Sequence, residues 1–428
     1  MGALLVGALL CAPATRASAQ AAAPPLSLAD ARAAARRASP DVRAAREAVA
    51  AARGRERQAG VVPNPTFSYG REQTSGGGQS NAQDILAVEQ PLELGGLRSA
   101  RAEAARLRRE AAEARLAAAE IAADFEATRA YAWAVAADRR ARLADQAARA
   151  FTQAVSVSEQ RLAAGDVSGY AARRVRLEAA RYAALRAEAM MASRDARLQL
   201  GALLAADVAG VRWLDASLWD SLPPATDVAS ADSLQAAARR TRAELRVAEL
   251  EARAAQADAR VAARERTPIP VLQAGFKSET SAGSDDRLNG FVAGVSVPLP
   301  LFDRRRGAIE AAGADARRRE SEAEGVRRRV VLEVAEAREA LVAVREQLAL
   351  LAPQLGAESA RALRAAQVAY SEGEITLAEW LDAARAYHEA ETSYATLRAE
   401  ALVRQAALER AVGAPLPPLT TPDRGTDR

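Results

Sequence analysis

The side chains best suited to catalysis and metal binding are scarce in this chain. Among its 428 residues there is one histidine, His388, and one cysteine, Cys11. Zinc and copper sites are built mainly from clusters of these residue types, and a hydrolytic triad needs a histidine held by further groups. The glycine run that starts at Gly76 lacks the Lys-Ser/Thr pair of a phosphate-binding loop. We therefore predict a protein that is not an enzyme, with no cofactor and no metal site, in which His388 packs against or lies on a helix.

The charged side chains are balanced in sign. There are 59 Lys and Arg against 55 Asp and Glu, and the arginines alternate with acids at helical spacing. This pattern is typical of solvated helix faces and does not favour nucleic-acid binding. Half of the residues are hydrophobic but only 4% are aromatic, which indicates long packed helices in place of a large globular core.

The elements that carry these residues occur twice. Three landmarks recur at a distance of 205 to 208 residues, which indicates internal duplication. They are Pro63-Asn64-Pro65 and Pro268-Ile269-Pro270, Pro91-Leu92-Glu93-Leu94 and Pro298-Leu299-Pro300-Leu301, and Gly165-Asp166-Val167-Ser168 and Gly373-Glu374-Ile375-Thr376. Each copy has the order helix, two strands, long helix, glycine turn and helix. We place the first repeat at 20–200 and the second at 233–412.

The remaining segments flank these repeats. Residues 1–19 are expected to be a signal peptide, because a Leu/Ala-rich run precedes the small-x-small pattern Ala17-Ser18-Ala19. Cys11 lies in this segment, so cleavage would leave a chain without cysteine. The linker over 201–232 is expected to pack around the middle of the helices through Trp213 and Trp219, together with a Pro-rich tail over 413–428.

Long helices dominate both repeats. Leu26–Gly60 reads as helix with a break near Ser39-Pro40, and Leu97–Arg161 contains no proline, so that it would extend on the order of 100 Å. A heptad-like seam follows in the second copy, with Pro353 expected to kink it. The seam consists of Val330, Val334, Ala337, Leu341, Val344, Leu348, Leu351 and Leu355. A helical hairpin that turns at Gly165 or Gly373 is predicted in each repeat.

Four segments alternate with a period of two residues, near 66–73, 83–90, 271–280 and 289–298. Loops are predicted between the strands of each pair, at Ser75–Ser80 and Ser281–Asp286. Within 84–90, Leu86 and Val88 fall on one face and Ile85 and Ala87 on the other. Ile85, Val88, Phe291 and Val295 are the positions at which an arginine on an outward, lipid-facing surface is expected to be costly. About ten residues suit a tilted transmembrane strand, but four strands cannot close a barrel, so several chains would have to share one. The alternative is a pair of soluble β-ribbons, which agrees with the few Trp and Tyr residues near the strand ends.

The order of these features resembles the TolC-type outer membrane efflux family. The motifs Gln90-Pro91-Leu92-Glu93-Leu94-Gly95-Gly96-Leu97-Arg98 and Pro298-Leu299-Pro300-Leu301-Phe302-Asp303-Arg304 carry the resemblance together with the two glycine turns. It implies a mainly α fold with a membrane β-barrel. Each chain would supply long antiparallel coiled-coil hairpins and four strands to a trimeric 12-stranded barrel and an α-helical tunnel. Gly95-Gly96 and Leu301-Phe302-Asp303 look closer to the heavy-metal efflux branch than to the multidrug branch.

The resemblance also implies partners and functional residues. The partners are two further copies of the chain, a periplasmic adaptor (membrane fusion) protein, an inner-membrane pump of the RND type and outer membrane lipid. The acids of a periplasmic constriction map onto Glu379 and Asp382, where crowding in a trimer would raise the carboxylate pKa values; the alternative is an ordinary solvated helix face. The first repeat has Ala171 at the matching position. The hairpin tips expected to dock the adaptor are Gly165, Asp166, Val167, Ser168, Gly373, Glu374, Ile375 and Thr376.

Two function classes stay open. The first is a passive exit duct across the periplasm and the outer membrane for substrate delivered by a pump and an adaptor. The second is a soluble periplasmic coiled-coil adaptor or scaffold. Adaptors of that kind usually place one hairpin within a small β-domain, so the duplication favours the duct. Metal cations, drugs and polypeptides are all candidate substrates.

Overall fold

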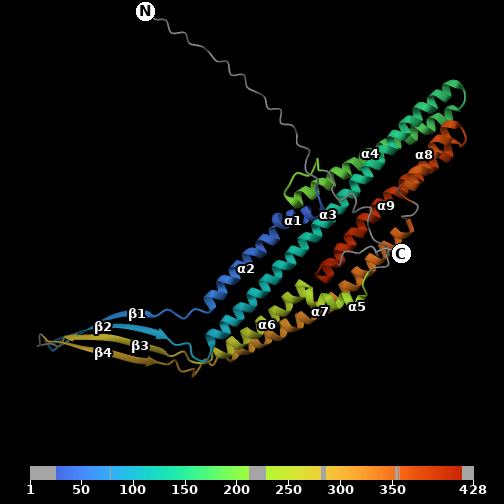
Figure 1. The fold of residues 1–428 in the computed structure, drawn as a ribbon. Coiled ribbons are helices and arrows are strands. Elements are labelled where there is room, and N and C mark those ends of the chain that lie inside the picture. The colour runs from blue at the N-terminus through green and yellow to red at the C-terminus, as the bar shows by residue number, and fades with distance from the viewer. Residues whose placement is uncertain are drawn as a thin grey trace, which may run out of the picture.

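The structure is a computed structural model. The chain is elongated, and a four-stranded sheet projects from one end of a stack of long helices (Figure 1). It describes residues 26–77, 79–211, 228–280, 286–351, 355 and 357–416. The predicted signal peptide, Trp213, Trp219, Pro353 and most of the predicted C-terminal tail lie outside the described residues. The described residues still cover most of both predicted repeats.

The first repeat contains four helices. They are α1 (Leu28–Ala38), α2 (Pro40–Ala59), α3 (Leu97–Ala164) and α4 (Gly169–Leu204). The predicted break between α1 and α2 is confirmed at Ser39, whose hydroxyl accepts a hydrogen bond of 3.3 Å from the Val42 N–H. Pro40 follows at the first helical position, where the missing N–H costs nothing.

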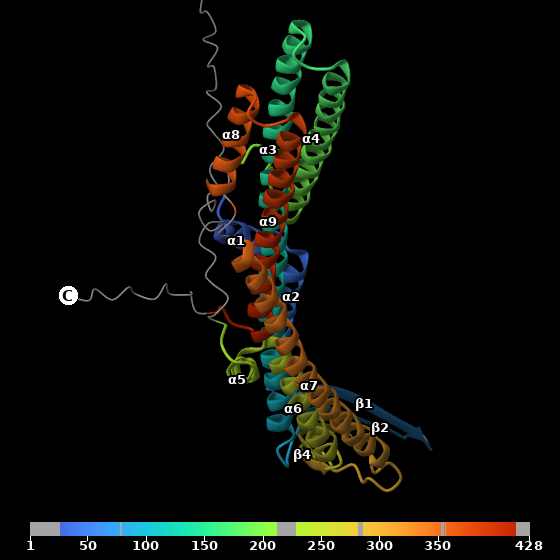
Figure 2. The same cartoon turned by 90° about the vertical axis from the view of Figure 1, so that its right-hand side faces the viewer.

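The second repeat has the same plan with one difference. Its helices are α5 (Ala231–Thr241), α6 (Ala243–Arg264), α7 (Arg306–Leu351), α8 (Ala357–Glu372) and α9 (Leu377–Val412). Where the first repeat has the single helix α3, the described residues of the second repeat form α7 up to Leu351 and α8 from Ala357, with a bend at Leu355 between them. Both hairpins extend toward the end of the molecule opposite the sheet (Figure 2).

Small side chains fill the space between the helices. α3 packs against α2, α4, α6 and α9, and its buried positions are mainly alanine, which allows helix axes to approach closely. The predicted seam of the second repeat is confirmed by its buried members Val330, Val334, Leu341, Val344 and Leu348. Among the described helices, none combines the length and the apolar character needed to cross a bilayer.

The strands form one antiparallel sheet with the order β1-β2-β3-β4. They are β1 (Thr66–Gly76), β2 (Gln79–Pro91), β3 (Val271–Thr280) and β4 (Arg287–Ser296). β2 pairs with β3, so the central pairing joins the two repeats. The turn lies within the predicted loop Ser75–Ser80, but the predicted loop is too long, because pairing continues to Gly76 opposite Gln79. Gly77, with φ 61°, supplies the left-handed conformation that a tight hairpin turn requires.

Candidate functional site

One face of the sheet carries apolar side chains from all four strands. The register places Tyr69 opposite Leu86, Leu86 opposite Phe276 and Phe276 opposite Phe291, which makes a continuous row across the sheet. The rings of Phe276 and Phe291 meet edge to face with centroids 6.2 Å apart. The neighbouring rows are Phe67, Val88, Ala274 and Ala293, and then Gln90, Leu272 and Val295.

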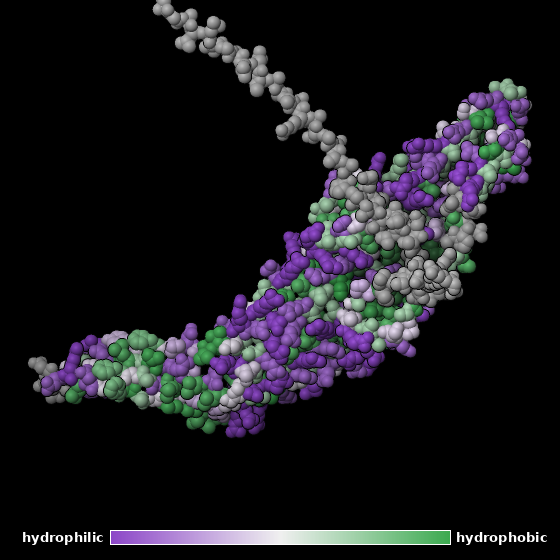
Figure 3. All heavy atoms as spheres, viewed as in Figure 1, coloured by the Kyte–Doolittle hydropathy of each residue, from purple (hydrophilic) through white to green (hydrophobic). Residues whose placement is uncertain are grey.

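This apolar sheet face, defined by those three rows, is exposed. Phe291 is 93% exposed and Val295 66% exposed. Figure 3 shows hydrophobic residues gathered over the strands, whereas hydrophilic residues cover much of the helices. A monomeric protein rarely leaves such a continuous apolar surface in water, so this surface indicates contact with lipid or protein.

The opposite face of the sheet is mainly polar or small, although Leu288 and Val292 also lie on it. Its hydrogen bonds include Gln273 Nε2 to Glu89 Oε1 at 3.3 Å, and Lys277 forms an ion pair of 3.0 Å with Glu279. Ile85 lies on this polar face, opposite Gly70 and Lys277. The predicted grouping of Leu86 and Val88 on one face, against Ile85, is therefore confirmed. An outward, lipid-facing place for Ile85 is wrong, because residues an odd number of positions apart in a strand point to opposite faces.

Both outer strands leave one edge without a partner among the described residues. β1 pairs only with β2, and β4 only with β3, within the part of the chain that the structure describes. These edges are eleven and ten residues long. Long unpaired edges beside an apolar surface recruit further strands, and in lipid their backbone groups must be paired.

The two hairpin tips at the other end of the molecule are built alike. Gly165 and Gly373 both adopt φ 84°. The N–H of Asp166 donates to the Arg161 carbonyl at 2.9 Å, and the N–H of Glu374 donates to the Ala369 carbonyl at 2.8 Å. These bonds satisfy the last carbonyls of α3 and α8, as glycine-terminated helices do.

The rest of each tip starts the returning helix. The Ser168 hydroxyl accepts from the Ala171 N–H at 3.2 Å, and the Thr376 hydroxyl accepts from the Glu379 N–H at 3.3 Å. Val167 and Ile375 are half-buried and turn inward, whereas the remaining tip residues are exposed. The tips are therefore rigid turns with a polar outer surface.

The predicted constriction acids occupy unequal surroundings. The carboxylate of Glu379 accepts hydrogen bonds of 2.7 Å from both the N–H and the hydroxyl of Thr376, and these bonds lower the pKa of Glu379 below its usual value of 4.5. Asp382 has a side chain that is 73% exposed and lies 3.6 Å from Arg385. Arg385 also forms an ion pair with buried Glu178 of α4. Each acid thus has a local partner, and both face solvent in a single chain.

An arginine that sequence reasoning missed joins the two tips. Arg161, in the last turn of α3, donates to the carbonyl of Ser371 at 3.2 Å and to that of Tyr370 at 3.5 Å. Its guanidinium also lies 5.6 Å from the centre of the Tyr370 ring. Arg161 therefore helps to cap the C-terminal end of α8, although it belongs to the other repeat.

A buried aromatic cluster lies behind the tips. Phe151 stacks on Tyr182 at 4.2 Å and meets Trp380 at 5.1 Å, and Tyr370 stacks on Trp380 at 5.5 Å. His388 packs edge-on against Tyr182 at 5.5 Å, and burial lowers the pKa of its imidazole. This confirms the prediction that His388 is a packing residue. A cavity of about 380 Å³ separates α3, α8 and α9 beside this cluster.

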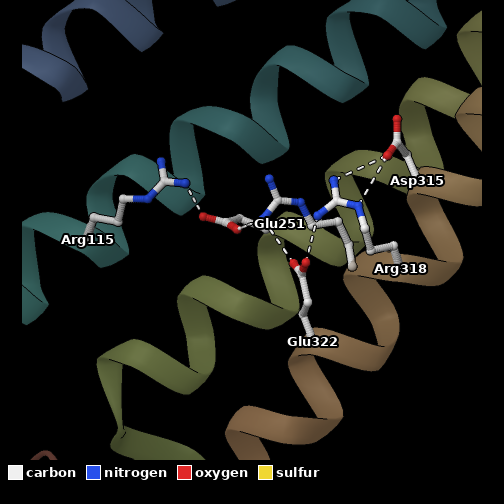
Figure 4. A network of polar contacts seen from close by, with 6 residues as sticks. Arg115, Glu251, Asp315, Arg318 and Glu322 are labelled. Atoms are coloured by element: carbon white, nitrogen blue, oxygen red, sulfur yellow. Dashed lines mark hydrogen bonds and ion pairs between the residues drawn. The ribbon is translucent and has the colours of Figure 1, made fainter.

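A polar network ties the repeats together nearer the sheet (Figure 4). Glu251 of α6 pairs with Arg115 of α3, and with Arg319 of α7 at 3.0 Å. On α7 the network continues through Glu322 to Arg318 at 2.6 Å. The described residues contain no group of three or more His, Cys, Asp or Glu side chains able to hold a metal ion.

Residues 234–414 match the family model described as outer membrane efflux protein. The chain is 27% identical over 361 residues to the cobalt-zinc-cadmium resistance protein CzcC of Cupriavidus metallidurans, covering 83% of this chain and 82% of the relative. It is also 27% identical over 258 residues to the nickel-cobalt-cadmium resistance protein NccC of Alcaligenes xylosoxydans xylosoxydans, covering 60% and 56% of the two chains.

Solved structures share the fold. CusC superposes with a TM-score of 0.71 at 19% identity, covering 90% of this chain and 92% of that chain. The outer-membrane channel OprN superposes with a TM-score of 0.72 at 23% identity, covering 90% of each chain. These structures confirm the mainly helical fold with its four-stranded sheet. The family match over residues 234–414 and the relative CzcC confirm the predicted resemblance and the function class of an outer membrane efflux protein.

Proposed function

We propose that this chain, a relative of the TolC-type outer membrane efflux proteins, assembles as a trimer that forms a passive exit duct through the periplasm and the outer membrane. The observation that carries the proposal is the apolar sheet face, which ends in two strand edges without a partner among the described residues and is attached to long helical hairpins. In this role the chain would catalyse no reaction, and the pump would supply the energy for transport.

The unpaired edges support a shared barrel. β1 and β4 run in opposite directions, so β4 of one copy can pair with β1 of the next in the antiparallel sense used within the sheet. Three copies would contribute twelve strands and leave no edge in lipid. The apolar sheet face would contact lipid and the polar face would line the lumen.

The helices supply the periplasmic part of the duct. The exposed tips around Gly165 and Gly373 would dock a periplasmic adaptor, and their rigid capped turns suit a surface that must hold its shape. Glu379 and Asp382 of three copies would form the constriction at this end, since both face solvent in the single chain. The division into a signal peptide at 1–19, repeats at 20–200 and 233–412, a linker and a tail is part of the same proposal.

The substrate class we propose is divalent metal cations. Support comes from the relative named for cobalt, zinc and cadmium resistance, which matches over most of both chains. An RND-type pump and its adaptor would deliver the ions. The chain would then need only a polar path, without a resident metal site.

Membrane fractionation of the expressed chain tests the duct, followed by light-scattering mass after detergent extraction. We expect recovery in the outer membrane with about three times the mass of the mature chain, and conductance in planar bilayers. A monodisperse monomer in the periplasmic fraction would overturn the proposal in favour of a coiled-coil scaffold, the alternative that the family match does not favour.

A further inference from the structure

The loop between β4 and α7 exposes its largest apolar side chains. Phe302 is 100% exposed, Leu299 72% and Leu301 64%. The loop is nevertheless ordered by its own contacts. The N–H of Leu301 donates to the Leu299 carbonyl at 2.8 Å, and Arg305 forms an ion pair of 2.5 Å with Glu265. These apolar side chains are thus held outward by a fixed loop.

The corresponding loop of the first repeat has the same design. Leu94 is 56% exposed and Leu92 37% exposed. The N–H of Leu94 donates to the Leu92 carbonyl at 2.9 Å, which matches the turn at Leu301. Glu93 turns back to pair with Arg101 at 2.7 Å, so only the leucines project. Exposed leucines on a hydrogen-bonded turn therefore occur at both places where a strand leads into a long helix.

Unpaired arginines follow each loop. Arg304 and Arg306 are exposed and have no ion pair within the described part of the chain, and the same holds for Arg98 after the first loop. Many other arginines of this protein are paired with an acid, as in the network of Figure 4. Free guanidinium groups beside exposed leucine and phenylalanine side chains form a surface that combines apolar and cationic character.

We propose that the two strand-to-helix loops anchor the protein in the periplasmic leaflet of the outer membrane. Leu92, Leu94, Leu299, Leu301 and Phe302 would enter the boundary between headgroups and acyl chains. Arg98, Arg304 and Arg306 would bind phospholipid phosphates. The inference rests on the proposed function, because it requires the apolar sheet face to lie in lipid.

Position and charge favour phospholipid as the occupant. Val297 is 46% exposed and continues the alternation of Phe291, Ala293 and Val295 toward the loop, so the apolar surface runs without interruption from sheet to loop. The loops lie where the sheet meets the helices (Figure 1), which is the interfacial level if the strands span the bilayer. Side chains with an apolar body and a cationic head are stabilised there. The loops would thus serve where a barrel usually carries Trp and Tyr.

The test places a fluorescent label at chosen cysteines in the full-length chain that carries Cys11→Ala. Phe302→Cys is labelled with NBD, and the protein is reconstituted in phosphatidylethanolamine and phosphatidylglycerol vesicles that contain doxyl-labelled lipid. We expect the label at position 302 to be quenched at least twofold by shallow doxyl groups. Tyr170→Cys, also highly exposed but close to a hairpin tip, should show no such quenching. Leu94→Cys repeats the test in the first loop.

Phe291→Cys separates the two proposals. If label 291 is quenched by deep doxyl groups and label 302 is not, the anchor is wrong and the duct stands. If neither label is quenched and the chain does not insert, the proposed function itself fails. A label at 302 that is shielded both from lipid and from aqueous iodide would indicate contact with a second copy and would also overturn the anchor.

The arginines are tested by lipid retention. Arg304→Gln combined with Arg306→Gln should reduce the phosphatidylglycerol that copurifies with the detergent-extracted protein by at least twofold. Arg173→Gln combined with Arg174→Gln removes the same charge near a hairpin tip and should leave retention unchanged. Equal retention in both double variants would contradict the assigned phosphate contacts.

Discussion

A charged side chain on the apolar sheet face would lie in the lipid of the proposed assembly. Val88 belongs to this face and Ile85 to the polar face of the same strand. We predict that Val88→Arg makes folding into bilayers less favourable by about 2–4 kcal/mol, the usual cost near mid-membrane. Ile85→Arg, its matched control, should cost much less because its side chain would reach the lumen. Urea titration of folding into vesicles measures both variants, and equal costs would show that neither face lies in lipid.

Glu379 offers a second test at the scale of one residue. Its folded-state pKa is lowered by the N–H and the hydroxyl of Thr376. The stabilisation from this carboxylate is therefore complete above its unfolded pKa and is lost as the pH falls through the lower folded value. A closed ring of acids in a trimer would act in the opposite direction, because like charges raise a carboxylate pKa.

The measurement is the pKa of Glu379 in the trimer, by infrared difference spectroscopy against Glu379→Gln. We predict a pKa below the usual value for glutamate, since both hydrogen bonds that lower it lie within one chain. A value well above 4.5 would show that crowding at the constriction exceeds the effect of the cap.

Thr376→Ala, which removes the cap, should cost about 0.5–2 kcal/mol of helix stability.

At the scale of the elements, Arg161 couples two hairpins that are far apart in the sequence. Its guanidinium holds the carbonyls of Tyr370 and Ser371 at the end of α8. We predict that Arg161→Ala increases amide hydrogen exchange over residues 369–375 while leaving the sheet unchanged. Arg149→Ala, which removes an exposed arginine that pairs only with Asp145 on the same helix, is the control. Unchanged exchange in Arg161→Ala would mean that the tips are held by their own turns alone.

The elements themselves could be predicted from the sequence because each leaves a local signal. The two glycine turns, the Ser39-Pro40 break and the buried seam from Val330 to Leu348 all depend on neighbours in the chain. Relations across the chain left no such signal. The continuation of pairing to Gly76 and the reach of Arg161 to Ser371 depend on strand pairing and on tertiary packing, which local periodicity does not specify.

The same limit applies to the candidate site. The tip residues were found through the repeated Gly-x-x-Ser/Thr pattern, whose turn chemistry is local. The apolar row from Tyr69 to Phe291 joins strands of both repeats, so its continuity could be seen only once the sheet was assembled. The same holds for the arginines after each strand-to-helix loop, because only the fold places them where the sheet meets the helices.

At the scale of the whole molecule, the polar sheet face predicts the selectivity of the duct. The described strand residues on this face include three acids and one base, which gives a net charge of −2 per chain. They are Glu72, Glu89, Glu279 and Lys277. Three copies would surround the lumen with this charge, and acidic linings favour cations. We predict a cation-selective channel in planar bilayers whose reversal potential in a salt gradient moves toward zero in the Glu72→Gln and Glu89→Gln double variant. Asp84→Asn alters the opposite, apolar side of β2, the strand that carries Glu89, and should leave the reversal potential unchanged. Anion selectivity, or an equal response to Asp84→Asn, would mean that the polar face does not line the conducting path.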